Sequence, residues 1–216
     1  MAKRLYSLML NDEVVRAVDE EAHRRGTNRS ALIDDVLAEY FGVSTFQRRM
    51  NDIFSEIDSF FASSENLVPF FMPHSDTFYL KSALSYKYRP TLKYELVLDH
   101  STSNKLGDMT LHFRTQSEAL LEELARFFKL WVGIERSYFE ENGLQVPAYS
   151  LYQNRFMRSI ALPQKRDYNA QQIAAAVSRY VDFFDASLKA YIGGAKDREA
   201  IARDYAEYVQ EAGIIL

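Results

Sequence analysis

The stretch Lys3-Arg4-Leu5-Tyr6-Ser7-Leu8-Met9-Leu10 and the turn Gly26-Thr27-Asn28-Arg29-Ser30 decide how the N-terminal part of this chain folds. Side chains at residues 5–10 alternate, with Tyr6, Leu8 and Leu10 on one face and Leu5, Ser7 and Met9 on the other. A period of two is typical of a β-strand with one buried face. We expect the Tyr6, Leu8 and Leu10 face to be buried, because the opposite choice leaves more apolar area in water.

Two short helices are predicted after this strand. Asn11 suits a helix N-cap, and apolar residues recur from Val14 to Ala22 on a helix that runs to about residue 25. Gly26 can end that helix with a positive φ, and Asn28 can cap the next. The second helix ends near residue 42, and its expected apolar stripe comprises Leu32, Ile33, Val36, Leu37 and Tyr40.

A single strand has no ladder partner, so its amides and its apolar face would both be left exposed. Antiparallel pairing with the same strand of a second copy, about a two-fold axis, satisfies both. The sequence therefore predicts an obligate homodimer.

The order of strand, helix, glycine-containing turn and helix resembles the ribbon-helix-helix family of DNA-binding proteins, the CopG, Arc and MetJ group. Residues 4–10, 14–22 and 26–33 carry the resemblance, which covers residues 3–42, about a fifth of the chain. The resemblance implies that the paired strands enter the DNA major groove. It implies base-facing positions at Lys3, Leu5, Ser7 and Met9. It implies phosphate contacts at Arg4, Asn28, Arg29 and Ser30, where the start of the second helix offers free amides.

The predicted base-facing strand departs from the family's polar pattern. Leu5 and Met9 are apolar, so they suit thymine methyl groups, and Ser7 can donate or accept a hydrogen bond. We expect an operator with A/T-rich half-sites. The alternative is that Leu5 and Met9 contact protein, which would make the chain an interaction module such as an antitoxin or an accessory protein of plasmid maintenance or transfer.

Charge does not favour strong nonspecific binding to nucleic acid. Residues 1–49 hold eight basic and eight acidic side chains, and the remainder holds 18 and 22, which gives the net charge of −4. Nonspecific affinity requires a local excess of positive charge. Adjacent dimers on repeated half-sites, a higher oligomer on DNA, would compensate.

Composition sets the class of protein. The chain contains no cysteine, so neither a disulfide scaffold nor a thiolate metal site is expected, and a cytoplasmic location is predicted. We find no stretch typical of a membrane span or a signal peptide. At 216 residues, the chain has room for the N-terminal module at 1–43 and one ordinary domain at 63–216.

Residues 44–62 form a predicted connecting helix. Phe46, Met50, Ile53, Ile57 and Phe60 follow an alternating spacing of four and three residues, with Phe54 and Phe61 beside them. This seam either extends the dimer contact or packs the helix on the second domain. Two heptads are too few for a coiled coil, which favours the second interpretation.

The second domain is predicted to be α+β, with a small antiparallel meander covered by long helices. Strands are expected at residues 84–89, 92–98 and 109–114, with further short strands near 67–72, 149–152 and 157–162. Helices are expected from about Thr115 to residue 141 and in two segments after residue 170. The solvent face of the meander would gather a basic patch for an acidic ligand, a partner protein or flanking DNA, formed by Lys87, Arg89, Lys93, His112 and Arg114. The alternative is that this patch is an ordinary solvated face.

No motif for catalysis was found. The chain lacks glycine-rich phosphate loops and nucleophile motifs. Its four histidines, His23, His74, His100 and His112, show no metal-ligand spacing. We expect no enzymatic activity, no metal and no cofactor. The sequence predicts a homodimeric, sequence-specific double-stranded DNA-binding protein, most simply a transcriptional repressor. Its second domain is expected to regulate or oligomerise in response to an effector or protein partner.

Overall fold

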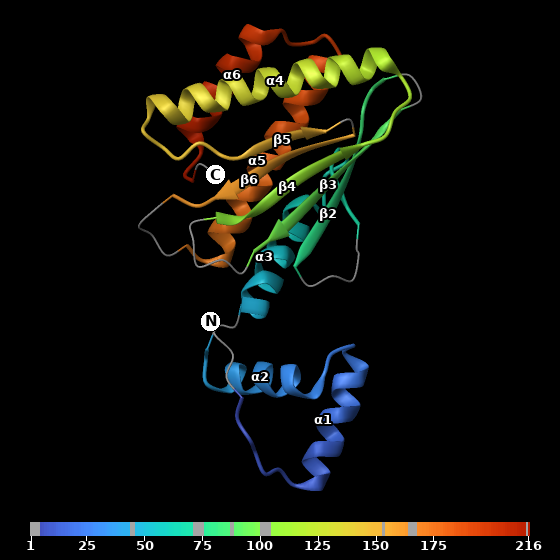
Figure 1. Ribbon diagram of the computed structural model, residues 1–216, viewed down its shortest axis with the longest axis vertical. Coiled ribbons are helices and arrows are strands. Elements are labelled where there is room, and N and C mark those ends of the chain that lie inside the picture. The colour runs from blue at the N-terminus through green and yellow to red at the C-terminus, as the bar shows by residue number, and fades with distance from the viewer. Residues whose placement is uncertain are drawn as a thin grey trace. The chain divides into compact units, whose positions relative to one another are not determined.

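The computed structural model describes residues 5–43, 46–70, 76–86, 89–99, 105–152, 154–163, 168–214 and 216. The chain divides into two compact units, residues 1–51 and 52–216, and each is described by itself (Figure 1). Helix α3, Phe46–Phe61, crosses the boundary between them.

The first unit contains the two predicted helices. Helix α1, Asp12–Arg24, ends at a turn in which Gly26 has a φ of 64° and the Thr27 amide donates to the Ala22 carbonyl at 2.9 Å. Helix α2, Arg29–Tyr40, begins at Asn28, whose side chain accepts a hydrogen bond from the Ala31 amide. Asn11 occupies the N-cap position of α1, but its side chain makes no capping hydrogen bond.

Residues 5–11 have no regular secondary structure in the single chain. The predicted ribbon is therefore not confirmed. A strand requires a partner for its amides and carbonyls, and one copy of this segment provides none. Residues 3 and 4 of the predicted strand lie outside the described residues.

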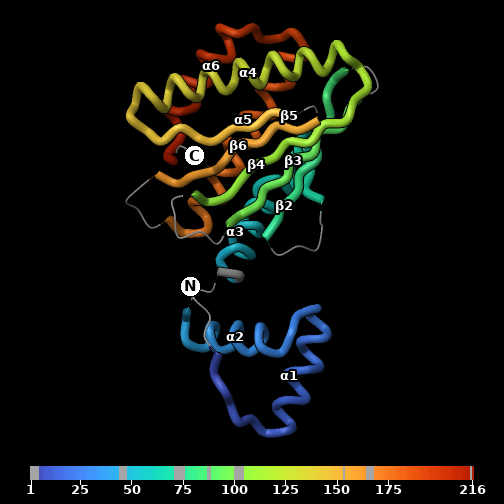
Figure 2. Tube along the Cα trace, viewed as in Figure 1, coloured from blue at the N-terminus to red at the C-terminus, as the bar shows by residue number. Residues whose placement is uncertain are grey.

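The second unit contains one open, antiparallel sheet with the strand order β1-β2-β3-β4-β6-β5 (Figures 1 and 2). The strands are β1 Val68–Pro69, β2 Thr77–Ala83, β3 Thr91–Leu98, β4 Lys105–Phe113, β5 Tyr149–Tyr152 and β6 Arg155–Ala161. Strand β6 pairs directly with β4, although the long helix α4, Glu118–Glu141, and strand β5 separate the two in the sequence. Strand β5 extends the sheet beyond β6. With α5, Ala170–Ile192, and α6, Arg198–Glu211, this confirms the α+β class.

The helices cover one face of the sheet. Leu92, Tyr94, Leu96 and Leu98 alternate into the core from β3, while Lys93 and Glu95 face away from it. Phe128 of α4 stacks on Phe156 of β6, with ring centroids 4.6 Å apart. Phe184 of α5 packs against the same two rings, and in Figure 1 the strands lie in front of α5. The other sheet face is left without a covering helix among the described residues.

The part of α3 in the second unit packs on the core face of the sheet. Ile53, Ile57 and Phe61 are buried, and Phe54 stacks on Phe78 of β2 at 5.6 Å. Phe60 is largely exposed, so the buried stripe continues from residue 57 to residue 61 instead of residue 60. Packing on the second domain was the favoured interpretation of this helix.

One predicted strand is misplaced. Residues 84–89 were expected to form a strand, but β2 ends at Ala83 and the described residues 84–86 and 89 are not in a strand; residues 87 and 88 lie outside the described residues. The Arg89 amide donates to the Tyr86 carbonyl at 2.8 Å, and Arg89 has a φ of 45° ahead of Pro90, so this segment turns the chain into β3.

The core contains charged groups that the sequence did not reveal. Arg158 of β6 and Glu135 of α4 are fully buried and form an ion pair at 3.0 Å. Tyr149 donates to Glu135 at 2.9 Å, and the Arg158 guanidinium lies over the Tyr180 ring. Glu135 keeps the pKa of Arg158 above its ordinary value despite burial, and burial raises the pKa of Tyr149.

A second buried carboxylate, Asp185 of α5, joins the sheet to the helix layer. It accepts hydrogen bonds from Tyr94 at 2.8 Å and Ser82 at 3.0 Å, and Lys189 lies 2.7 Å from it. Buried polar groups with such complete pairing fix one arrangement of their elements. None of the helices in the described part of the chain has the length and apolar character that crossing a membrane requires.

Candidate functional site

The segment at residues 5–10 leaves its apolar side chains in solvent. Leu5 and Met9 are fully exposed, whereas exposure falls from 75% at Tyr6 to 61% at Leu8 and 42% at Leu10. The predicted inward face is thus the less exposed of the two, but the single chain does not bury it. Apolar area of this kind in so small a unit is typical of an interaction surface.

The two helices continue this surface. Leu32 and Ala22 are buried between them, as expected. Four other members of the predicted stripes are exposed in the single chain, namely Val14, Val36, Leu37 and Tyr40. Two apolar side chains that follow α2 are exposed as well, Phe41 and Val43. The first unit therefore lacks a complete core of its own.

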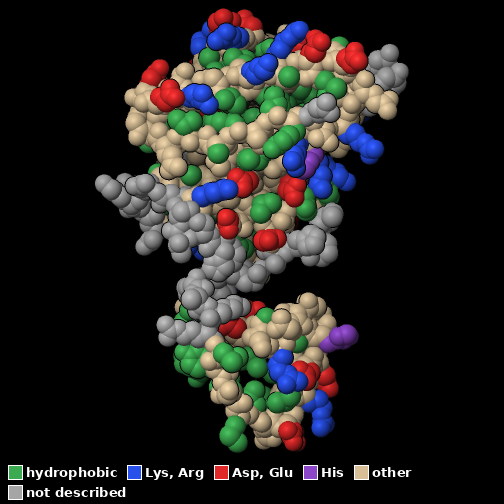
Figure 3. All heavy atoms as spheres, viewed as in Figure 1, with side chains coloured by type: hydrophobic (Ala, Val, Ile, Leu, Met, Phe, Trp, Pro, Cys, Tyr) green, Lys and Arg blue, Asp and Glu red, His purple; other side chains and the backbone are tan. Residues whose placement is uncertain are grey.

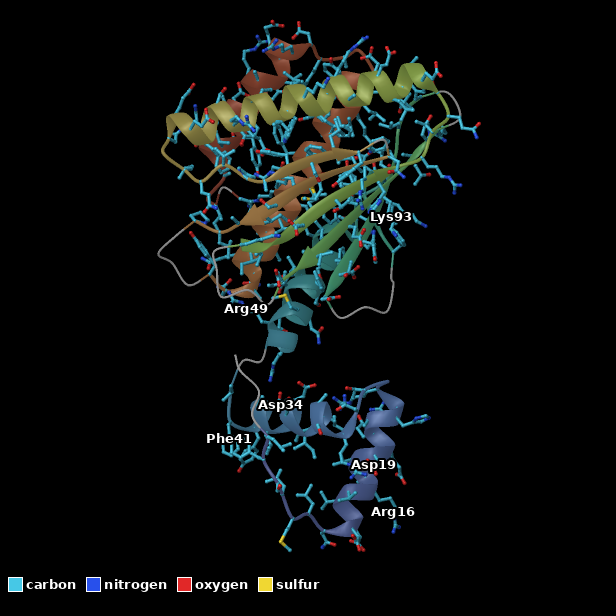
Figure 4. The ribbon with its side chains drawn as sticks, viewed as in Figure 1. Arg16, Asp19, Asp34, Phe41, Arg49 and Lys93 are labelled. Carbon is cyan, nitrogen blue, oxygen red and sulfur yellow. The ribbon has the colours of Figure 1, made fainter. Side chains whose placement is uncertain are left out.

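The turn before α2 presents the predicted phosphate site. The backbone amides of Arg29 and Ser30 lie in the first turn of α2, where no carbonyl of the helix can accept their hydrogen bonds. Both amides are therefore available to bind an anion. The Arg29 guanidinium is hydrogen-bonded to Asp19 of α1 and lowers the pKa of that carboxyl. Asp19 is labelled on α1 in Figure 4. Lys3 and Arg4 lie outside the described residues.

The other basic side chains near this turn are also paired. Arg24 and Arg25 both hydrogen-bond to Glu21, which lowers the pKa of that carboxyl to about 2. Phosphate binding at the turn would therefore compete with ion pairs inside the unit. These ion pairs are exposed and contribute little to stability, so breaking them to bind a phosphate costs little free energy.

The open face of the second-unit sheet gathers basic side chains from several strands. Lys81 of β2 lies opposite Lys93 of β3, Lys93 lies opposite His112 of β4, and His112 lies opposite Arg155 of β6. We call Lys81, Lys93, His112 and Arg155 the basic row. Figure 3 shows basic side chains beside the histidine on this unit, and Figure 4 labels Lys93 on the sheet.

Aromatic rings support the cations of the basic row. Lys93 Nζ lies 4.0 Å from the centroid of the Tyr79 ring, and Lys81 Nζ lies 4.2 Å from that of Phe70. The Arg155 guanidinium lies 4.4 Å from the Tyr152 ring. Cation–π contacts of this kind contribute about 0.5–1 kcal/mol each at exposed sites.

Glu95 is the carboxylate that lies closest in register to the basic row. Its Oε2 lies 2.6 Å from His112 Nε2, and its Oε1 accepts a hydrogen bond from Tyr79 at 3.3 Å. Burial raises the pKa of Tyr79, and the negative charge of Glu95 raises it further. Glu95 thus contacts His112 and Tyr79, and among the described residues it forms no ion pair with Lys81, Lys93 or Arg155.

The predicted patch is brought together only in part. Lys93 and His112 share the open face, as expected. Arg89 lies in the turn between β2 and β3, and Arg114 directly follows β4, so neither is on a strand. Lys87 lies outside the described residues. Sequence reasoning missed Lys81 and Arg155, because it did not place strand β2 and started the later strand at Met157.

A groove of about 660 Å³ lies between α4 and α6. Its lining includes Arg126, Lys129 and Arg198 around the small residues Gly133 and Ala202. Arg126 is paired with Glu123 at 2.7 Å. This groove therefore contains three basic side chains outside the sheet face, with Glu141 also in its lining, and serves for comparison with the basic row.

No cluster of metal-binding side chains occurs in the described ranges, from which His74 and His100 are missing. No protein-family model matches the chain, and neither a curated protein nor a solved structure is significantly similar to it.

Proposed function

We propose that this protein is a homodimeric, sequence-specific double-stranded DNA-binding protein, most simply a transcriptional repressor. The observation that carries the proposal is the first unit's incomplete core. Its alternating segment and two helices leave apolar faces exposed that a second copy of the same segment would cover. The two-helix arrangement with an Asn-capped second helix agrees with the ribbon-helix-helix resemblance.

In the proposed complex, the two copies of residues 5–10 pair antiparallel and enter the major groove. Leu5, Ser7 and Met9 then face the bases, and the fully exposed Leu5 and Met9 suit thymine methyl groups. The amides at the start of α2 hold a phosphate on each side and fix the register of the dimer. The second unit regulates occupancy or assembly by favouring one arrangement of the two DNA-binding modules.

The proposal is tested by selecting bound fragments from random duplex DNA with the full-length protein. We expect an inverted repeat with A/T-rich half-sites. The variant L5A/S7A/M9A should lose the selected bases, because it removes the base-facing side chains while leaving Tyr6, Leu8 and Leu10 in place. A matched control, L144A/L151A, removes exposed apolar side chains from the second unit and should return the wild-type motif.

Two results would contradict this assignment. An unchanged motif from L5A/S7A/M9A would show that another element reads the bases. Enrichment of G-rich half-sites would contradict apolar contacts to thymine.

The second candidate function is protein interaction, as in an antitoxin or a plasmid accessory protein. The observation that favours it is the same exposure of Leu5 and Met9, since apolar side chains on an outer face also suit a protein partner. If the full-length protein enriches no duplex sequence, yet co-purifies with the product of a neighbouring gene through Leu5 and Met9, this function replaces the first.

A further inference from the structure

We propose that the basic row on the open sheet face is a second DNA contact, which binds the phosphate backbone of duplex DNA without reading sequence. The proposed function assigns DNA binding to residues 1–43, so this surface is additional to it. The inference rests on the proposed function only in taking duplex DNA as the ligand.

The register of the sheet places the four side chains in one line across four strands. Lys81, Lys93, His112 and Arg155 are directly opposite one another in successive strand pairs. With neighbouring strands about 4.8 Å apart, the row is roughly 14 Å long, which is about four steps of the 3.4 Å axial rise between phosphates on one strand of DNA. The sheet therefore presents a row of basic side chains long enough to face several successive phosphates of one DNA strand.

The row is unfavourable for the isolated sheet. Like charges at directly opposite positions destabilise an antiparallel pair, and Lys81 and Lys93 form such a pair. In the described structure, neither of them nor Arg155 forms an ion pair with a carboxylate, although the chain has a net charge of −4. Unbalanced cations on an open face are complementary to a polyanion.

The aromatic rings favour duplex over single-stranded nucleic acid. Single strands bind by stacking bases on free ring faces. Here Phe70 and Tyr79 lie beneath lysine ammonium groups, and Tyr152 lies beneath Arg155. The rings position the cations and offer little platform for bases, so contacts to phosphate are the interaction that this face supports.

The test compares two triple variants of the full-length protein. K81Q/K93Q/R155Q removes three cations from the row and keeps His112 with Glu95. R126Q/K129Q/R198Q removes three cations from the groove between α4 and α6, so both variants carry the same net charge. Binding is measured by fluorescence anisotropy on a duplex limited to the selected site, on one extended by two helical turns at each end, and on random-sequence duplex.

We expect the row variant to bind the extended and random duplexes about tenfold to a hundredfold more weakly. The slope of log affinity against log salt should become shallower by about 2–3, since each phosphate contact contributes roughly 0.9. The groove variant should behave as wild type. The variant K81R/K93R keeps the charges and should retain affinity. Fluorescence of Trp131 confirms that each variant is folded.

The outcomes separate this inference from the proposed function. Unchanged affinity and salt slope in the row variant overturn the inference and leave the proposed function intact. If no sequence is selected, but random duplex binds through the row, the proposed function fails and the inference stands. If wild type binds no duplex of any kind, both fail. If single-stranded DNA or an acidic polypeptide binds the row more tightly than duplex does, the inference is overturned.

Discussion

Gly107 lies where β4 passes close to the end of β3. A Cβ atom at this position would be 1.9 Å from the Val97 carbonyl oxygen, and the strand register shifts between Lys105 and Gly107. We expect Gly107→Ala to lower the free energy of unfolding by about 1–3 kcal/mol, because the backbone of β3 must move to make room. Urea denaturation followed by Trp131 fluorescence measures the change.

Gly133→Ala is the matched control for this substitution. Gly133 lies inside α4, and a Cβ there meets nothing within 4 Å. Alanine should raise the free energy of unfolding by roughly 0.5–1 kcal/mol, since glycine is a weak helix former. Equal effects at both positions would show that the close approach to Val97 does not constrain the fold.

The sequence could not predict the burial of polar residues whose hydrogen-bond or ion-pair partners are distant in the chain. Ser82 occupies a core position of β2 because Asp185, 103 residues away, accepts its hydrogen bond. Arg158 and Glu135 are buried because they pair with each other. Periodicity assigns charged and polar residues to the solvent face, so it cannot anticipate a buried partner.

At the level of elements, the alternating segment at residues 5–10 has two faces that should behave differently. Leu8→Asp/Leu10→Asp places charge on the less exposed face, and we expect it to convert the dimer into a monomer in sedimentation experiments. Leu5→Asp/Met9→Asp places the same charge on the fully exposed face. That variant should remain a dimer and lose DNA binding.

The opposite pattern, or a wild-type protein that is monomeric at micromolar concentration, would contradict the predicted ribbon. Equal disruption by both variants would also contradict it, since a pleated strand buries only one face.

Helices α1 and α2 were predictable because local residues determine them, namely the Asn28 cap and the glycine at position 26. Strand β2 was not, since Ser82 on its core face and Tyr79 on its open face obscure the alternation. The missing strand explains why the predicted patch lacked Lys81. Arg89 was placed on a strand because Leu84, Tyr86 and Tyr88 alternate, although Pro90 follows and favours a turn.

For the whole molecule, the two units should unfold in different ways. The second unit has a continuous aromatic core around the single tryptophan, Trp131, which contacts Phe127, Phe184 and Tyr205. The first unit depends on a second copy in our proposal. We expect its thermal transition, followed by circular dichroism, to rise by roughly a few degrees for each tenfold increase in protein concentration, as mass action requires.

The transition of the second unit, followed by Trp131 fluorescence, should not depend on protein concentration. A shift of the Trp131 transition with concentration would place the dimer contact on the second unit. Independence of both transitions from concentration would contradict a homodimer held by residues 1–43.

The α+β class and most helices of the second unit could be predicted from the sequence, because their apolar stripes are long and regular. The pairing of β6 with β4 could not, since α4 and β5 separate them in the chain. The basic row depends on that pairing, because it brings Arg155 beside His112. Its four members are spread over about 75 positions of the sequence, so no local pattern connects them.

The two outermost strands of the sheet are short. Strand β1 has two residues, one of which is Pro69 with no amide hydrogen to donate, and β5 has four. Edge strands this short offer few hydrogen bonds to a strand of a neighbouring molecule. Copies of this protein held close together at high local concentration would therefore resist fusing into fibrils.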